Sequence, residues 1–190
     1  MKHTAFYLLL SLVVLVFSFI IGGGTVFAEP KPSAQPPSPQ PGPAIDGVVA
    51  AGEYPLSFDL APFKVWVSRT GNVIRFAVSA KTRGWVALGL DSRRMDGAAI
   101  FMGEVKNGKA VFSEQTGRGH SHAETPADKR LATKYAVKLE GDTTTLEFEC
   151  PAAKVLPKDA KELPVILASS PSDSLRAYHA TRLSAVLKLE

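Results

Sequence analysis

One methionine of this chain stands in a polar turn between two apolar segments. Met95 follows Arg93 and Arg94 and precedes Asp96 in "DSRRMDGA". Methionine usually fills gaps in a hydrophobic core, but here its neighbours are charged. A thioether is a soft metal ligand, and a thioether with an imidazole is one of the axial pairs that hold haem iron. Such a pair would occupy both axial positions, so the haem would transfer electrons and leave no site for oxygen.

Three histidines that could supply an imidazole lie beyond the first residues of the chain. In "GHSHAE", an extended backbone would place His120, His122 and Glu124 on one side. Two imidazoles and a carboxylate so arranged could bind zinc or copper. Glycines at 117 and 119 and a proline at 126 favour a solvated loop instead. His179 lies near the end of an apolar segment, where a lone histidine is more often structural.

The elements that must position these residues are strands. Apolar residues alternate with polar ones in short segments, and Asn107-Gly108 and Gly141-Asp142 have the composition of hairpin turns. Such strands, with turn signals every 8 to 12 residues, are typical of an all-β sandwich of about nine to ten antiparallel strands. We also expect a short helical turn at 157–162 and an inward-facing Cys150. The expected strands are 63–69, 72–80, 84–90, 98–105, 109–115, 131–140, 143–150, 163–170, 175–180 and 183–189.

The beginning of the 190-residue chain has the composition of a leader and a spacer. Residues 1–28 combine Lys2, an apolar run and small residues before Glu29, which predicts a signal peptide, with an uncleaved anchor as the alternative. The proline-rich segment 29–43 should be an extended linker. Residues 44–190 should form one folded domain. We therefore expect a secreted or periplasmic protein, held on the outer side of a membrane if the leader remains.

Charge and motifs exclude several classes of function. The net charge of +4 is too small to indicate a nucleic-acid partner. We find no G-x-S-x-G motif, no obvious carboxylate pair and no phosphate-binding loop beyond the leader, so we expect no catalytic activity of its own. A covalently attached haem would need Cys-x-x-Cys-His, and the chain has a single cysteine.

Motifs in a fixed order along the chain resemble the DOMON family, specifically its bacterial secreted branch related to the cytochrome domain of cellobiose dehydrogenase. "GWVALGL" is similar to that family's Gly-Trp strand, and "TTTLEFEC" to its Thr-x-x-Glu-Phe strand. Ala99 departs from the aspartate that the family usually has there. The other matching segments are "AIDGVVAAGEY" (44–54), "MDGAAIFMGEVKNGKA" (95–110), "TPADK" (125–129) and "YHATR" (178–182).

The resemblance implies an immunoglobulin-like β-sandwich that binds haem b without a covalent bond. It assigns the axial ligands to Met95, in the loop after the Gly-Trp strand, and to His179, near the C-terminus. Arg93 and Arg94 could then pair with the haem propionates, because guanidinium groups match carboxylates bidentately, or could be a solvated turn; Arg176 and Arg182 are weaker candidates for that pairing. Apolar walls would come from residues such as Leu90, Ile100, Phe101, Met102 or Leu175.

Two functions remain open from the sequence. One is an extracytoplasmic electron-transfer module that serves a redox partner protein. The other is a carbohydrate-binding module without haem, in which exposed aromatic rings would stack on sugars. The aromatic residues considered for that role are Tyr54, Trp66, Trp85 and Tyr178, and Trp85 also has the pattern of a core residue.

Overall fold

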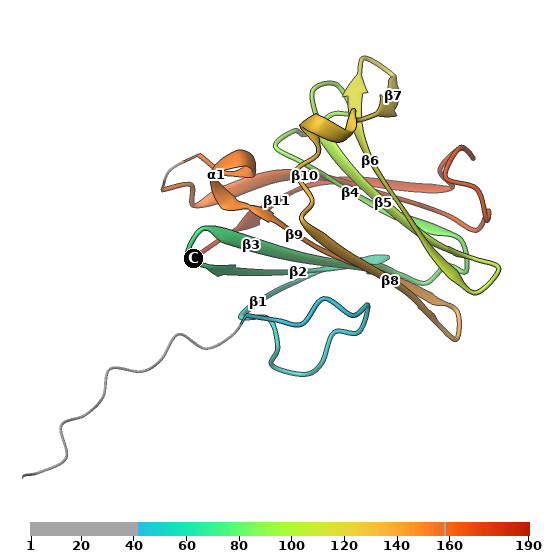
Figure 1. The fold of residues 1–190 in the computed structure, drawn as a ribbon, viewed down its shortest axis with the longest axis horizontal. Coiled ribbons are helices and arrows are strands. Elements are labelled where there is room, and N and C mark those ends of the chain that lie inside the picture. The colour runs from blue at the N-terminus through green and yellow to red at the C-terminus, as the bar shows by residue number, and fades with distance from the viewer. Residues whose placement is uncertain (1–41, 158) are drawn as a thin grey trace, which may run out of the picture. The chain divides into compact units, whose positions relative to one another are not determined.

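The computed structural model describes residues 42–157 and 159–190. Our expectations for the leader 1–28, and for all but the last two residues of the linker 29–43, lie outside the described residues. Within the described part, eleven strands form two antiparallel sheets, which confirms the predicted all-β sandwich (Figure 1). No helix among the described residues has the length and apolar character needed to cross a membrane.

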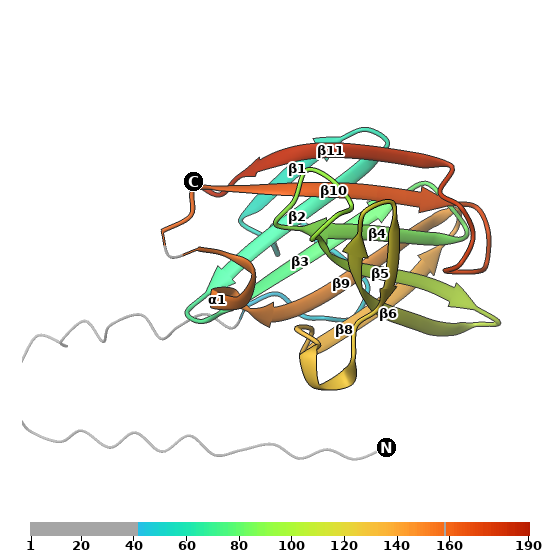
Figure 2. The same cartoon turned by 90° about the horizontal axis from the view of Figure 1, so that it is seen from above.

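The two sheets face each other and can be followed in Figure 2. In spatial order, the five-stranded sheet contains β1 (Leu56–Leu60), β2 (Phe63–Thr70), β3 (Val73–Ala80), β9 (Thr143–Pro151) and β8 (Lys134–Glu140). The six-stranded sheet contains β11 (Thr181–Lys188), β10 (Glu162–Ser170), β4 (Trp85–Leu90), β5 (Ala99–Lys106), β6 (Lys109–Arg118) and β7 (Ser121–Glu124).

Four elements differ from the sequence-based expectations. β1 and the short strand β7 were not predicted as strands, and β7 is extended where the glycines and proline favoured a loop. The predicted strand 175–180 is instead a loop, in which the Ala177 amide donates to the Ser174 carbonyl at 2.8 Å. The helical turn α1 (Ala152–Val155) lies before residues 157–162, because it begins directly after Pro151 and Pro157 has no amide proton to continue it.

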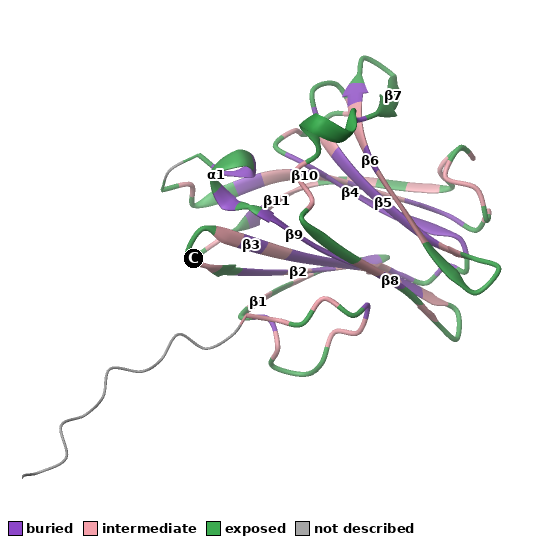
Figure 3. Cartoon of the chain, viewed as in Figure 1, coloured by how far each residue is buried: buried purple, intermediate pink, exposed green. Residues whose placement is uncertain are grey.

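The main core fills the space between the sheets, as the buried inner strands in Figure 3 show. Phe148 lies between two other rings, with centroids 5.3 Å from Phe76 and 4.1 Å from Phe101. Cys150 faces the same core and is fully buried, as its place in the strand predicted. Burial raises the pKa of its thiol to about 12.

Strand β4 is buried on both faces. One face packs in the main core and the other belongs to a second apolar cluster. Val86, Leu88 and Leu90 face the main core. Trp85 and Ala87 point the other way and join a second apolar cluster on the outer face of the six-stranded sheet. A strand covered on both faces has an apolar sequence throughout. The other buried members of the second cluster are Ala98, Ile100 and Met102.

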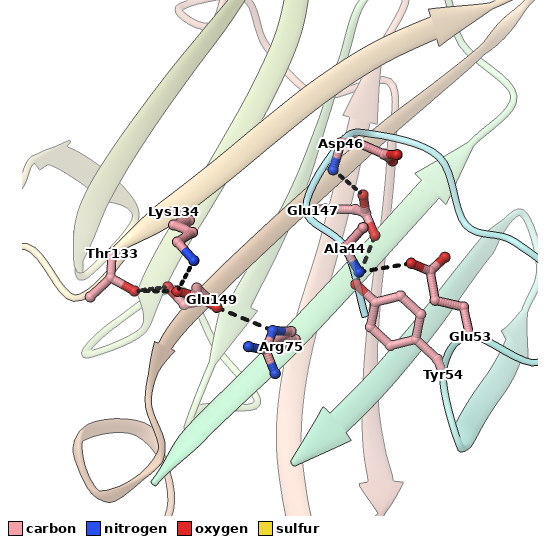
Figure 4. A network of polar contacts seen from close by, with 9 residues as sticks. All are labelled: Ala44, Asp46, Glu53, Tyr54, Arg75, Thr133, Lys134, Glu147 and Glu149. Atoms are coloured by element: carbon pink, nitrogen blue, oxygen red, sulfur yellow. Dashed lines mark hydrogen bonds and ion pairs between the residues drawn. The ribbon is translucent and has the colours of Figure 1, made fainter. Parts of the chain in front are cut away.

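The segment before β1 is fastened to the outer face of the five-stranded sheet by one buried carboxylate. Glu147 on β9 accepts hydrogen bonds from the amides of Asp46 at 3.0 Å and Gly47 at 2.7 Å, and from the Tyr54 hydroxyl at 2.7 Å (Figure 4). Burial, opposed by these three bonds, raises the pKa of Glu147. The motif "AIDGVVAAGEY" therefore serves the fold and lies on the sheet that does not carry the site.

Candidate functional site

A cavity of about 720 Å³ lies over the outer face of the six-stranded sheet. Its floor comes from three neighbouring strands, β4, β5 and β10, and most of the floor residues are apolar or small. Gly89 contributes no side chain to the floor, and its Cα lies close to Ile166. A mostly apolar cavity with a few polar groups is typical of a small-molecule or cofactor site. The floor residues are Trp85, Ala87, Gly89, Ile100, Met102 and Ala168.

Met95 lines this cavity from the loop between β4 and β5. Its position follows from backbone contacts with β6: the Gly97 amide donates to the Gly117 carbonyl at 3.1 Å, and the Gly117 amide donates to the Ala98 carbonyl at 2.9 Å. The Met95 carbonyl accepts from the Ala98 amide at 3.1 Å. A Cβ atom at position 117 would overlap the Met95 carbonyl oxygen, so only glycine permits this approach.

The side chain of Asp96 ties the same loop to the turn between β6 and β7. Its Oδ1 accepts from the Gly119 amide at 2.7 Å, and its carbonyl accepts from the Ser92 hydroxyl at 3.2 Å. Ser92 also accepts from the Arg94 amide at 3.1 Å. The polar residues around Met95 thus fold the loop and leave the thioether at the cavity.

His179 lines the cavity from a different loop, the one between β10 and β11. Its ring is half-buried and lies against the Tyr178 ring, with centroids 4.2 Å apart. The next residue is fixed to the sheet, because the Ala180 amide donates to the Ser169 carbonyl at 2.8 Å. The structure therefore brings the two predicted ligands, Met95 and His179, to one cavity from loops that are far apart in sequence.

The "GHSHAE" segment also reaches the cavity, but only in part. His120 and His122 line it, whereas Glu124 pairs with Arg130 at 2.5 Å. In residues 42–157 and 159–190, no group of three or more histidine, cysteine or acidic side chains is arranged to hold a metal ion. The Nδ1 atom of His122 is hydrogen-bonded to Oε1 of Gln115. Partial desolvation, and then the charge of His179, lower the pKa of His122.

Arginines gather at the rim of the cavity. Arg93 and Arg94 line it as the sequence suggested, and Arg182 lines it as well, whereas Arg176 does not. Arg93, Arg94 and Arg182 are exposed, so their guanidinium groups are free to pair with the carboxylates of a ligand. The rim is thus cationic above an apolar floor.

The wall residues expected from the sequence divide between the two faces of the sheet. Ile100 and Met102 lie in the cavity floor, and Leu175 packs against their cluster. Leu90 and Phe101 instead belong to the main core, so they were wrong as wall residues. The reason is the two-residue period of β4 and β5, which sends alternate side chains to opposite faces.

Two buried polar side chains, which the sequence did not indicate, lie opposite each other on β4 and β5, and one of them, Trp85, lines the cavity. The register pairs Val86 with Gly103, and continuing it places Trp85 opposite Glu104. Both residues are buried, and Nε1 of Trp85 and Oε2 of Glu104 have no hydrogen-bond partner in the structure. Burial is the main cause of the raised pKa of Glu104.

The aromatic residues considered for sugar stacking are mostly unavailable. Tyr54 is buried against Glu147, and Trp85 is 3% exposed. Trp66 lies half-buried beneath Lys64, whose Nζ is 5.3 Å from the ring centroid. Tyr178 is 81% exposed beside His179. One of the four aromatic residues therefore offers a free ring close to the cavity.

A family model described as "DOMON domain" matches residues 61–161, which is more than half of the chain. The chain belongs to the DOMON domain family. This confirms the resemblance seen in the sequence motifs. The matched span contains Met95 and the β6–β7 hairpin and ends before His179.

Solved structures that are similar to this DOMON chain include two cytochrome domains. The cytochrome b domain of pyranose dehydrogenase from Coprinopsis cinerea matches with a TM-score of 0.50 at 9% identity, covering 67% of this chain and 76% of that one. The cytochrome domain of Myriococcum thermophilum cellobiose dehydrogenase matches with a TM-score of 0.51 at 10% identity, covering 71% and 81%. At such low identity the likeness shows a shared fold. No curated protein matches the sequence.

Proposed function

We propose that this DOMON domain binds one haem b in the cavity, with Met95 and His179 as axial ligands, and transfers electrons. The observation that carries the proposal is that a thioether and an imidazole, from two separate loops, line one cavity with an apolar floor. A haem held by this pair has no free axial position, and the thioether raises its reduction potential. The domain would then carry electrons to or from a redox partner protein and catalyse no reaction of its own.

The other residues of the cavity fit this ligand. A porphyrin ring needs a flat apolar surface, which the alternating outer residues of β4, β5 and β10 provide. The carboxylates of the porphyrin need cationic partners, which Arg93, Arg94 and Arg182 would supply at the rim. The cavity volume of about 720 Å³ lies within the usual range of ligand pockets, about 300 to 1,000 Å³. Both similar solved structures are described as cytochrome domains.

The expected location of the domain in the cell follows from the sequence of the leader. Residues 1–28 have the pattern of a signal peptide, so the domain would work outside the cytoplasm, tethered by the proline-rich linker if the leader stays. The carbohydrate-binding alternative has weaker support, because Tyr54 and Trp85 are buried.

A haem titration of the full-length chain tests the proposal. We expect a 1:1 complex with a sharp Soret band, split visible bands on reduction, and the weak near-infrared band of a thioether–iron bond. His179→Ala should convert the low-spin spectrum to a high-spin one. His120→Ala, which changes another histidine of the same cavity, should not. A folded protein that takes up no haem, but binds a glycan through Tyr178, would replace this proposal with the alternative.

A further inference from the structure

A third imidazole reaches the cavity from an element that the ligand pair does not use. His122 lies on β7, the strand at the edge of the six-stranded sheet, and lines the same cavity as Met95 and His179. The cavity thus has more potential ligands than two axial positions require, because His120 lines it as well.

The hydrogen bonds of His122 fix which of its nitrogens is free. In the structure, Nε2 of Gln115 donates to the Ser113 hydroxyl at 3.0 Å, and Oε1 of Gln115 is hydrogen-bonded to Nδ1 of His122. An amide oxygen can only accept, so Nδ1 of His122 must carry the proton. The lone pair of Nε2 is then available. Metal-binding histidines are commonly oriented in this way, by a partner that accepts from the other ring nitrogen.

His122 and Met95 share one side of the cavity, and Gly117 joins them. His122 is paired with Gly117 in the β6–β7 ladder. The Cα of Gly117 in turn abuts the Met95 carbonyl. His179 comes from the β10–β11 loop, so it faces the cavity from a separate element. His122 therefore lies beside the loop that carries Met95, and His179 reaches the cavity from another loop.

We propose that His122 is a second, alternative axial ligand on the Met95 side of the cavity, oriented by Gln115. This inference rests on the proposed haem binding and deepens it. In the haem-loaded protein, Nε2 of His122 would replace the Met95 sulfur as the group that holds the iron, with no change of oxidation state. No proton moves, because Nε2 already has a free lone pair. The site then has two imidazole ligands and a lower reduction potential, since the thioether no longer raises it.

The test compares single and double variants of the full-length chain reconstituted with haem b. Met95→Leu keeps an apolar side chain of similar size and removes the sulfur. We expect it to remain six-coordinate and low-spin, with the electron paramagnetic resonance signature of two imidazoles, no near-infrared thioether band and a lower potential than the wild type. Adding His122→Ala should make the haem high-spin. Adding Arg176→Ala, which changes an exposed residue outside the cavity lining, is the control and should leave it low-spin.

If the Met95→Leu/His122→Ala double variant folds poorly, another variant tests the same inference. Gln115→Leu in the Met95→Leu background keeps His122 but removes its hydrogen-bond acceptor, and we expect a larger high-spin fraction. A Met95→Leu protein that is high-spin by itself, or one that His122→Ala leaves low-spin, overturns the inference while wild-type haem binding stands. A wild-type chain that takes up no haem overturns the proposed function itself.

Discussion

The Met95 carbonyl oxygen lies against the Cα of Gly117, on the neighbouring strand, with no room for a Cβ between them. This contact fixes the height of the Met95 loop above the sheet. The apolar contacts of the loop come from the partly buried Met95 and from Ala98, and backbone contacts with β6 hold the loop in place.

Gly117→Ala should therefore displace Met95. We expect a loss of about 1–3 kcal/mol in the free energy of unfolding, typical of overpacking, and loss of the thioether band from the haem spectrum. Gly103→Ala is the control, because its Cβ would meet Val137 Cγ2 at 2.8 Å on the core side of the same sheet. Gly103→Ala should lower the free energy of unfolding, measured in urea, by a similar amount. It should leave the haem spectrum unchanged. Equal spectra for both variants would contradict the role assigned to Gly117.

The rim arginines should contribute to haem affinity through ion pairs that are open to water. Exposed ion pairs are worth about 0.2–1 kcal/mol each, so the double variant Arg93→Ala/Arg94→Ala should bind haem about 2- to 30-fold more weakly. The difference should shrink in high salt, since salt screens exposed charges. Arg176→Ala removes an exposed arginine that does not line the cavity and should leave the affinity unchanged in a Soret titration. If Arg176→Ala lost as much haem affinity as the double variant, the effect would come from the overall charge and not from the rim of the cavity.

Glu104 should make the domain less stable as the pH rises. Burial raises its pKa from 4.5, with Asp173 adding to the shift and Lys106 opposing it. A carboxyl group whose pKa is raised on folding stabilises the folded state below its unfolded pKa, and this contribution is lost as the pH rises through the folded pKa.

Glu104→Gln removes this titration and keeps the shape of the side chain. As the pH rises above 4.5, the ordinary pKa of this group, the free energy of unfolding of the variant should fall less than that of the wild type. Chemical unfolding at several pH values measures both slopes. Glu147 also has a raised pKa, so some slope should remain in the variant. A variant whose slope equals that of the wild type would show that Glu104 is ionised in the folded state without penalty.

The Tyr54 hydroxyl should stabilise the fold without influencing the cavity. It donates to the fully buried Glu147 on the sheet that does not carry the cavity. Tyr54→Phe leaves that carboxylate short of one donor, which should cost about 1–3 kcal/mol. Tyr135→Phe, with a ring 52% exposed, should change stability by less than about 0.5 kcal/mol. Thermal unfolding separates the two variants, and a changed haem spectrum in Tyr54→Phe would contradict the separation of the two faces.

The strands of the sandwich were predictable because their apolar residues repeat every second position. The place of Met95 was also predictable, since a methionine among charged residues has no core to fill. The double burial of β4 was harder to interpret: its apolar residues are continuous, and only the structure shows which of them face the cavity. Trp85 therefore had the pattern of a core residue although it lines the floor.

The partners of the site come from contacts that are distant in sequence. The β6–β7 hairpin brings His122 to the cavity because β7 pairs with β6, and the glycines and proline around it indicated a loop. The Trp85–Glu104 pair depends on the register of β4 and β5, which the sequence does not specify. Likewise, nothing near Glu147 in the chain indicates that it binds a segment about a hundred residues earlier.

The cavity lies outside the space between the two sheets, and this has a consequence for biogenesis. Three stacked phenylalanines and the strands around them complete the interior without any contribution from the cavity floor. The polypeptide can therefore reach its final shape empty. Under the proposed function, the domain would fold first and bind haem last.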